Sequence, residues 1–170
     1  IQINFLEKII FNIKVKETLS LIKGNLTTEE KIYFQEFIEF YEKRNLLVYD
    51  IKEIVAEKIR SLITRKEIKL RDAIDLFFIS KHFGVIPKDL IKEAKNKIIF
   101  AVENYEKYKD NLILSREQIE RIDFSYDDAK YLVIKDFEKK SFEDFAEKLK
   151  MFLEDLIKIL KHDFEKSSLQ

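Results

Sequence analysis

The chain has 170 residues, and its 32 basic side chains (Lys and Arg) exactly balance its 32 acidic ones, so the formal net charge is zero. This balance gives no support for bulk electrostatic binding to nucleic acid or to a membrane surface. No cysteine is present, which excludes a disulfide framework and a thiolate zinc site, and no apolar run approaches the roughly 20 residues of a membrane span. We therefore expect a cytoplasmic protein.

The first part of the chain predicts short strands and a helix. Residues 1–5 and 9–15 alternate apolar and polar side chains, as strands do, and residues 46–49 favour another strand. Between them, residues 16–23 favour a short helix that ends at Gly24.

A longer helix is predicted to follow, up to about residue 44. Thr27 and Glu30 form the capping-box pattern at its start. Its apolar side is more typical of a buried core than of a base-stacking surface. The residues on that side are Ile32, Tyr33, Phe34, Phe37, Ile38, Phe40 and Tyr41.

Two consecutive helices are predicted over residues 50–83, and both carry charges where packing would favour apolar side chains. Lys58 falls near the middle of the apolar stripe of the first helix, while Glu57 and Arg60 fall outside it. The second helix is apolar on nearly every side but contains Asp72 and Asp75, which are three residues apart and share a face. The stripe of the first helix is formed by Ile51, Ile54, Val55, Ile59 and Leu62.

These charges permit a structural and a functional interpretation. Buried acids cost several kcal/mol unless they are paired, hydrogen-bonded or bound to metal. In the structural interpretation, which periodicity alone favours, Lys58, Arg71, Asp72 and Asp75 form an ionic lock that pins two helices. In the functional one, Lys58 binds a phosphate in a polar cleft and an aspartate orients it. His82 shares the helix face of Asp75 and would hydrogen-bond it, line the cleft, or simply be semi-buried.

The rest of the chain predicts more helices with short links. Gly84 is a helix stop, Pro87 opens the next helix, and residues 104–111 lose periodicity as a linker does. Three capping patterns then predict helices at about 115–122, 125–139 and from 141 onward, the last with a long apolar stripe. The lysines of the helix after Pro87 predict a solvated face or, alternatively, a docking strip for RNA. They are Lys88, Lys92, Lys95 and Lys97.

Two stretches resemble a known family. The sequence EIVAEKIRSLITR, followed by LRDAIDLFFI, is similar to the AbiEii-type nucleotidyltransferase toxins, which carry a lysine helix and then a helix with an Arg-Asp-x-x-Asp pattern. Lys58, Arg71, Asp72 and Asp75 match that pattern in order. Residues 46–49 resemble the short strand before the lysine helix, and residues 1–8 resemble the strand that ends the family's catalytic core.

The resemblance implies a polymerase-beta-like nucleotidyltransferase that transfers a nucleotide from an NTP to an RNA or protein acceptor. Such proteins use two Mg²⁺ ions and often work in toxin–antitoxin or abortive-infection modules, so an antitoxin partner is implied. Carried over, Lys58 and Asp72 are the catalytic residues. Lys58 and Arg71 bind the nucleotide, and Asp75 and His82 support them.

The chain lacks the Gly-Ser and Asp-x-Asp patterns with which the family's catalytic core begins. We therefore expect that core, with its Mg²⁺ ligands, to lie upstream of Ile1, and these residues alone not to catalyse. The expected fold is mainly α: a helical bundle with a small N-terminal β portion, in which residues 1–49 end the nucleotidyltransferase-like core and residues 50–170 form a helical domain. The alternatives are a non-catalytic interaction domain with the ionic lock and an RNA-binding helical module.

Overall fold

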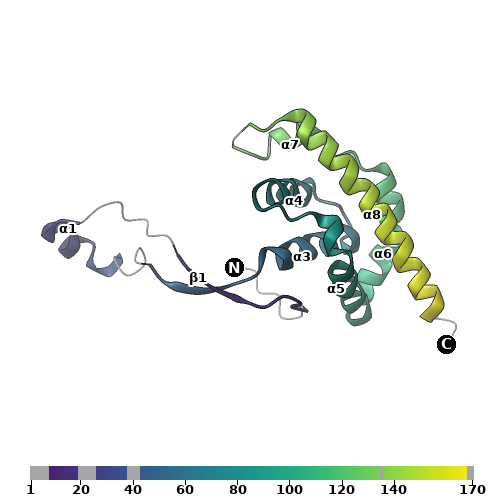
Figure 1. The fold of residues 1–170 in the computed structure, drawn as a ribbon, viewed down its shortest axis with the longest axis horizontal. Coiled ribbons are helices and arrows are strands. Elements are labelled where there is room, and N and C mark those ends of the chain that lie inside the picture. The colour runs from purple at the N-terminus through teal and green to yellow at the C-terminus, as the bar shows by residue number, and fades with distance from the viewer. Residues whose placement is uncertain (1–7, 19–25, 38–42, 135, 168–170) are drawn as a thin grey trace. The chain divides into compact units, whose positions relative to one another are not determined.

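The fold is mainly α-helical with one small antiparallel sheet, which confirms the predicted fold class. The computed structural model describes residues 8–18, 26–37, 43–134 and 136–167. The chain divides into two compact units, one of residues 11–50 and one that joins residues 1–10 to 51–170 (Figure 1). The interpretation of residues 1–49 as the end of a catalytic core stays a prediction.

The smaller unit contains β1 (Lys14–Glu17), α1 (Thr28–Tyr33) and β2 (Asn45–Val48). The strands pair antiparallel, with Val15 opposite Leu47. The strand predicted over residues 9–15 is displaced, because only residues 14–17 have a partner in the four-residue β2. The strand predicted at residues 1–5 and most of the helix predicted at 16–23 lie outside the described residues.

The predicted capping box is present at the start of α1. The Thr27 side-chain oxygen accepts from the Glu30 N–H at 3.2 Å, and the Thr27 N–H donates to Glu30 Oε2 at 2.8 Å. The helix is shorter than predicted, since it ends at Tyr33 and residues 35–37 are helical again only after a turn at Phe34.

The described part of this aromatic side is not buried, while Ile38, Phe40 and Tyr41 lie outside the described residues. Ile32 is 70% and Tyr33 82% exposed, and Phe34 and Phe37 are exposed too. Within residues 11–18, 26–37 and 43–50 no side chain is buried, so no described element of this unit covers them. The prediction failed because helical periodicity shows which side chains share a face, but not whether another element packs on it.

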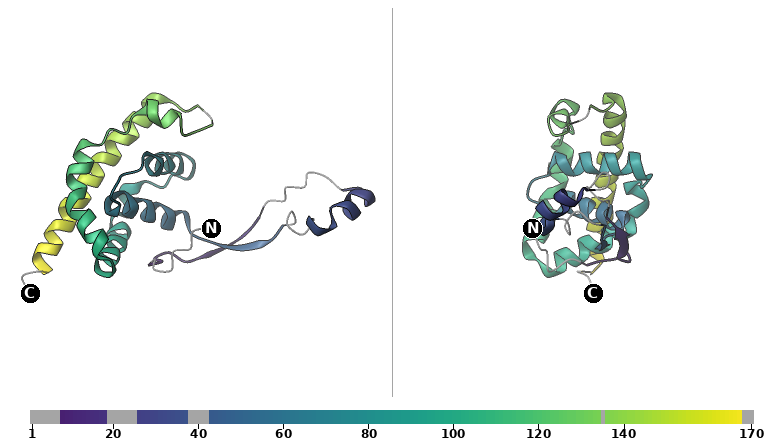
Figure 2. Two further views of the ribbon diagram at one scale, coloured as in Figure 1. Left: turned by 180° about the vertical axis from the view of Figure 1, so that it is seen from behind. Right: turned by 90° about the vertical axis from the view of Figure 1, so that its left-hand side faces the viewer.

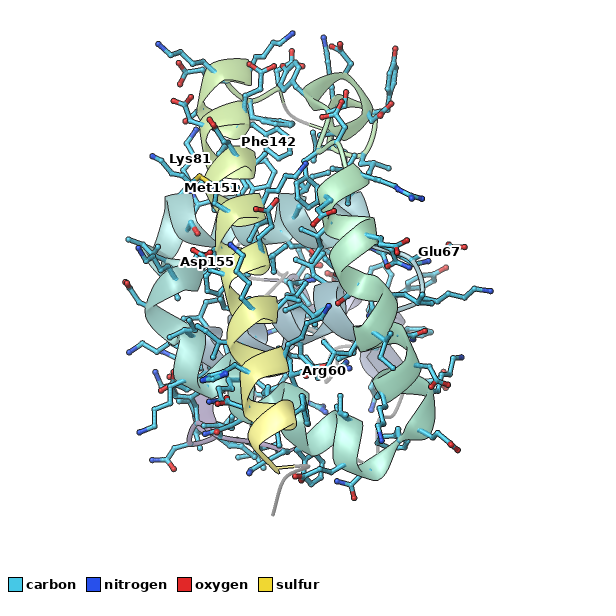
Figure 3. The ribbon with its side chains drawn as sticks, turned by 90° about the vertical axis from the view of Figure 1, so that its right-hand side faces the viewer. Arg60, Glu67, Lys81, Phe142, Met151 and Asp155 are labelled. Atoms are coloured by element: carbon cyan, nitrogen blue, oxygen red, sulfur yellow. The ribbon has the colours of Figure 1, made fainter. Side chains whose placement is uncertain are left out.

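The larger unit is built around α3 (Ile51–Thr64), which packs against α4 (Leu70–Phe83), α5 (Ile91–Asn104), α6 (Glu106–Arg121) and α8 (Lys139–Ser167). Figures 1 and 2 show α8 running along α6, and Figure 3 views the same pair from the side. Because helices surround α3, most of its side chains are buried. Its buried apolar residues are Val55, Ala56, Ile59, Leu62 and Ile63.

The long stripe on α8 is intramolecular core. Phe142, Leu149, Leu153, Leu156 and Leu160 are all buried. At its start, an aromatic cluster joins α8 to α4 and to the segment after α7 (Tyr126–Lys130). In this cluster the ring centroids of Phe77 lie 5.4 Å from Phe142 and 5.7 Å from Phe137. Such edge-to-face and tilted pairs add to the stabilisation from apolar burial.

Two local signals around residue 84 are confirmed. α4 ends at Gly84, whose φ of 66° is left-handed, with the Gly84 N–H donating to the Ser80 carbonyl at 3.0 Å. Pro87 then opens a 3-10 turn, η1 (Pro87–Leu90), directly before α5. Glycine is favoured at such a C-terminal position because it has no Cβ to clash.

The predicted helix boundaries beyond residue 104 were less accurate. The linker predicted at 104–111 is wrong, since α6 begins at Glu106, and Ser115 lies inside that helix with its hydroxyl donating to the Leu112 carbonyl at 2.7 Å. Ser125 does cap α7, but this helix ends at Lys130 instead of near 139. α8 begins at Lys139, before the predicted cap at Ser141.

Lys97 was predicted to lie on a solvated face of its helix, but it is buried. Its side chain is 1% exposed, and its Nζ lies 2.6 Å from Glu53 Oε1, which is also 1% exposed, and 3.4 Å from Glu57 Oε2. The other oxygen of Glu53 accepts from the Ile10 backbone N–H at 3.0 Å. A buried ion pair therefore joins α5 to α3, and its Glu53 carboxylate also binds the backbone at Ile10.

Removing Lys97 should be strongly destabilising, because it leaves the Glu53 carboxylate buried without its cation. We expect Lys97→Met to lower the free energy of unfolding by about 3–5 kcal/mol. Lys97→Met/Glu53→Gln should recover part of this loss, since the amide oxygen still accepts from Ile10. Urea unfolding measures both, and Lys92→Met on the exposed side of α5 is the control. Equal losses for the single and double variants would contradict the assignment.

Candidate functional site

The predicted charges of α3 and α4 come together where the two helices meet. Lys58 Nζ lies 3.2 Å from Asp72 Oδ1 and 2.5 Å from Asp75 Oδ2. Arg65, just beyond the end of α3, brings its Nη1 to 2.6 Å from Asp72 Oδ2. We call these four residues the Lys58 cluster. Lys58 lies within the apolar stripe of α3, as predicted, and its ammonium reaches the aspartates of α4.

The two aspartates of the Lys58 cluster have different surroundings. The side chain of Asp72 is 6% exposed and accepts from both Lys58 and Arg65. The side chain of Asp75 is 41% exposed and is paired with Lys58. The Lys58 side chain itself is 22% exposed. The ammonium is thus held by a buried carboxylate, Asp72, and by a more exposed one, Asp75.

Two other predicted site residues lie outside this contact network. Arg71 is exposed in the first turn of α4 and, within the described part of the chain, forms no ion pair with either aspartate. His82 is exposed near the end of α4, and its ring stacks on Phe78 with centroids 6.0 Å apart. It is therefore not semi-buried, as the sequence favoured, and among the described residues it forms no hydrogen bond with Asp75, which was an alternative. Arg65 was missed, since a basic residue after a helix carries no signal for a partner seven residues later.

A second charge network lies on the opposite side of α3. Glu57 accepts from Arg60 Nε at 2.9 and 3.0 Å, and Arg60 Nη1 donates to Thr64 Oγ1 at 2.8 Å. The Arg60 guanidinium also lies 5.2 Å from the ring centroid of Tyr108 (Arg60 is labelled in Figure 3). The helical wheel correctly places Glu57 and Arg60 outside the apolar stripe. Arg60 is nonetheless buried and the Glu57 side chain is only 23% exposed, because α5 and α6 cover that side.

This network shifts the pKa values of Glu57 and Arg60, each in the direction that favours the charged form. Burial alone would raise the pKa of Glu57, but the hydrogen bonds and positive charges of Arg60 and Lys97 outweigh it and hold that pKa below its ordinary value of 4.5. Burial would lower the pKa of Arg60, and the Glu57 carboxylate reverses this to raise it. Both groups therefore stay ionised at neutral pH and fix the rotation of α3.

The described residues do not fit a divalent metal site. They contain no group of three or more His, Cys, Asp or Glu side chains placed to hold a metal ion. Asp72 and Asp75 are only two carboxylates, and both already face a cation. A Mg²⁺ ion would have to compete with Lys58 for the same oxygens and would still lack ligands. Across the same part of the chain, no helix has the length and apolar character needed to cross a membrane.

Comparison with known proteins gives one result. The family described as nucleotidyl transferase AbiEii toxin of type IV toxin–antitoxin systems matches residues 14–167, which include every residue of both charge networks. The chain therefore belongs to the AbiEii family of nucleotidyltransferase toxins. No curated protein and no solved structure matches it.

The lowered pKa of Glu57 makes stability depend on pH in the acid range. A carboxyl group whose pKa is lower in the folded state stabilises the fold above its unfolded pKa and loses this contribution as pH falls through the folded pKa. We therefore expect the free energy of unfolding to decline below pH 4.5, and Glu57→Gln to lessen that decline. Urea unfolding across this range measures it. Glu117→Gln, in an exposed ion pair of α6, is the control; equal pH dependence in both variants would contradict the prediction.

Proposed function

We propose that this chain supplies the phosphate-binding side of a nucleotidyltransferase active site, with Lys58 as the ligand of the NTP triphosphate. The observation that supports it is the position of the Lys58 ammonium. The Lys58 side chain is 22% exposed, and its ammonium is oriented by Asp72, which Arg65 holds in turn. An ammonium held in this way needs little rearrangement to meet an incoming phosphate, and such preorganisation is what stabilises developing charge in phosphoryl-transfer chemistry.

Each predicted site residue has a separate part in this proposal. Lys58 neutralises charge on the triphosphate oxygens, and Asp72 positions the ammonium. Arg71, exposed in the first turn of α4, adds a second positive charge on the helix that carries the two aspartates. Asp75 and His82 support the site from the same helix. The metal ligands belong to carboxylates outside the described residues, since those present do not form a metal site.

The biological setting is also part of the proposal. The family description pairs a toxin with an antitoxin, and we propose that this protein works as the toxin of such a pair in the cytoplasm. The acceptor of the nucleotide is an RNA or a protein. The zero net charge of the chain favours recognition of the acceptor by a local patch over bulk electrostatic attraction.

The competing function is a non-catalytic interaction domain in which the Lys58 cluster is an ionic lock. One observation favours it, namely that each charge of the cluster faces an opposite charge within 3.2 Å. The two functions differ in what depends on Lys58. Without Lys58, Asp72 still has Arg65 and Asp75 is open to water, so no carboxylate is left buried and unpaired. We therefore expect Lys58 to contribute little to stability, unlike Lys97.

Replacing Lys58 should separate binding from stability. In the full-length protein with magnesium, we expect Lys58→Met to weaken NTP binding roughly 10- to 100-fold, as loss of a charge-assisted hydrogen bond does. The free energy of unfolding should change by less than about 1 kcal/mol. Calorimetric titration with each of the common ribonucleoside triphosphates measures the first, and urea unfolding the second.

The control is Lys158→Met, which removes an exposed lysine paired with Asp155 on α8 at 3.1 Å. It carries the same loss of charge far along the chain from α3, and we expect wild-type binding. If Lys58→Met binds NTP like the control but unfolds several kcal/mol more easily, the ionic lock is the better function. If this chain binds RNA at low salt in a salt-sensitive manner, the RNA-binding alternative gains instead.

A further inference from the structure

The Lys58 cluster is electrically neutral, although it is proposed to bind a polyanion. Lys58 and Arg65 supply two positive charges, and Asp72 and Asp75 supply two negative ones. A neutral cluster attracts a phosphate weakly, because the nearby carboxylates repel it almost as strongly as the cations attract it. A triphosphate therefore binds more strongly if it displaces one carboxylate from Lys58.

The surroundings of the two aspartates decide which one leaves. Asp72 is almost fully buried between Lys58 and Arg65, so withdrawing it would strand a carboxylate away from water, which is costly. Asp75 is 41% exposed, and rotation of its side chain returns the carboxylate to solvent. Exposed ion pairs of this kind contribute little and break easily. Asp75 is thus the displaceable partner.

Arg71 is placed to receive the displaced carboxylate. It precedes Asp75 by four residues on α4, the spacing at which side chains of a helix meet. It is exposed and forms no ion pair among the described residues, so it is available. The Lys58 ammonium has three N–H donors, and it can keep Asp72 on one while another passes from Asp75 to a phosphate oxygen.

We propose that Lys58–Asp75 is an exchangeable ion pair that gates the phosphate site. Without nucleotide, Asp75 holds the ammonium at its solvent-facing side. When a triphosphate binds, its oxygens replace Asp75 on Lys58, and Asp75 passes to Arg71, while Asp72 and Arg65 stay in place. This proposal rests on the proposed function of Lys58. It adds that nucleotide binding must offset the loss of the Lys58–Asp75 ion pair, which a highly charged triphosphate does more readily than a single phosphate.

The test compares nucleotide affinity in four forms of the full-length protein: wild type, Asp75→Asn, Arg71→Gln and the double variant. Removing the competing carboxylate should tighten ATP binding about two- to tenfold, in keeping with the strength of an exposed ion pair. Arg71→Gln should weaken it about twofold, because the displaced Asp75 then has no cation to receive it. In the Asp75→Asn background, Arg71→Gln should leave the ATP affinity unchanged, because residue 75 then has no carboxylate that could pair with Arg71.

The matched control is Asp155→Asn, which removes a carboxylate from the exposed Asp155–Lys158 pair of α8 and changes the net charge equally. Tightening in Asp75→Asn but not in the control assigns the effect to the Lys58 site. The gate is overturned if Asp75→Asn binds ATP no more tightly than wild type. It is also overturned if Arg71→Gln weakens binding equally in both backgrounds, since Arg71 then meets the nucleotide directly.

Failure of the gate is distinguishable from failure of the phosphate site. If Lys58→Met loses ATP binding while Asp75→Asn leaves affinity unchanged, Lys58 binds the phosphates and the exchange does not occur. If Lys58→Met retains ATP binding, the phosphate site itself is wrong and the gate falls with it. Thermal unfolding of each variant confirms that it is folded, which we expect because Asp75 and Arg71 are not buried.

Discussion

The buried ion pair between Glu53 and Lys97 is the constraint on which the rest of the helical unit depends. It joins α3 to α5 at 2.6 Å with both side chains almost completely excluded from water. Such a pair tolerates little displacement, because any other rotation of α3 would leave a charge buried alone. Lys58 follows Glu53 by five residues, which places it about 140° further around the helix. Fixing Glu53 on α5 therefore turns Lys58 toward α4.

The two charge networks of α3 thus have different physical characters. On the side of α5 and α6, Glu53, Arg60 and Lys97 are buried, and their partners cannot leave without a large energetic cost. On the side of α4, the Asp75 side chain is 41% exposed, and ion pairs with an exposed partner exchange more readily. The same helix therefore combines a rigid side, which sets its orientation, with a side on which one ion pair can exchange.

Sequence patterns found those parts of the molecule that depend on neighbours within one turn of helix. The capping box at Thr27, the stop at Gly84, and the shared face of Asp72 and Asp75 are of this kind. The pairing of Lys58 with these aspartates across two helices was also predicted, because charges inside apolar stripes need partners. Partners of charges outside such stripes were missed, because helix packing decides them. Lys97 looks like any other lysine on the polar side of its helix, but α3 covers it. For the same reason, periodicity grouped the aromatic residues after Thr27 correctly but could not show that they are exposed.

A neutral phosphate site has a physical advantage over a permanently free lysine. An unpaired ammonium at the surface attracts any phosphate, including the many phosphodiesters of cellular RNA, with similar energy for each charge. A lysine already paired with Asp75 gives up that partner only when the incoming anion interacts more strongly than the aspartate does. A triphosphate concentrates several charges within reach of one ammonium, whereas a phosphodiester carries one. The neutral Lys58 cluster would therefore favour NTPs by raising the threshold for every weaker anion, and the exposed position of Asp75 keeps that threshold low enough to be crossed.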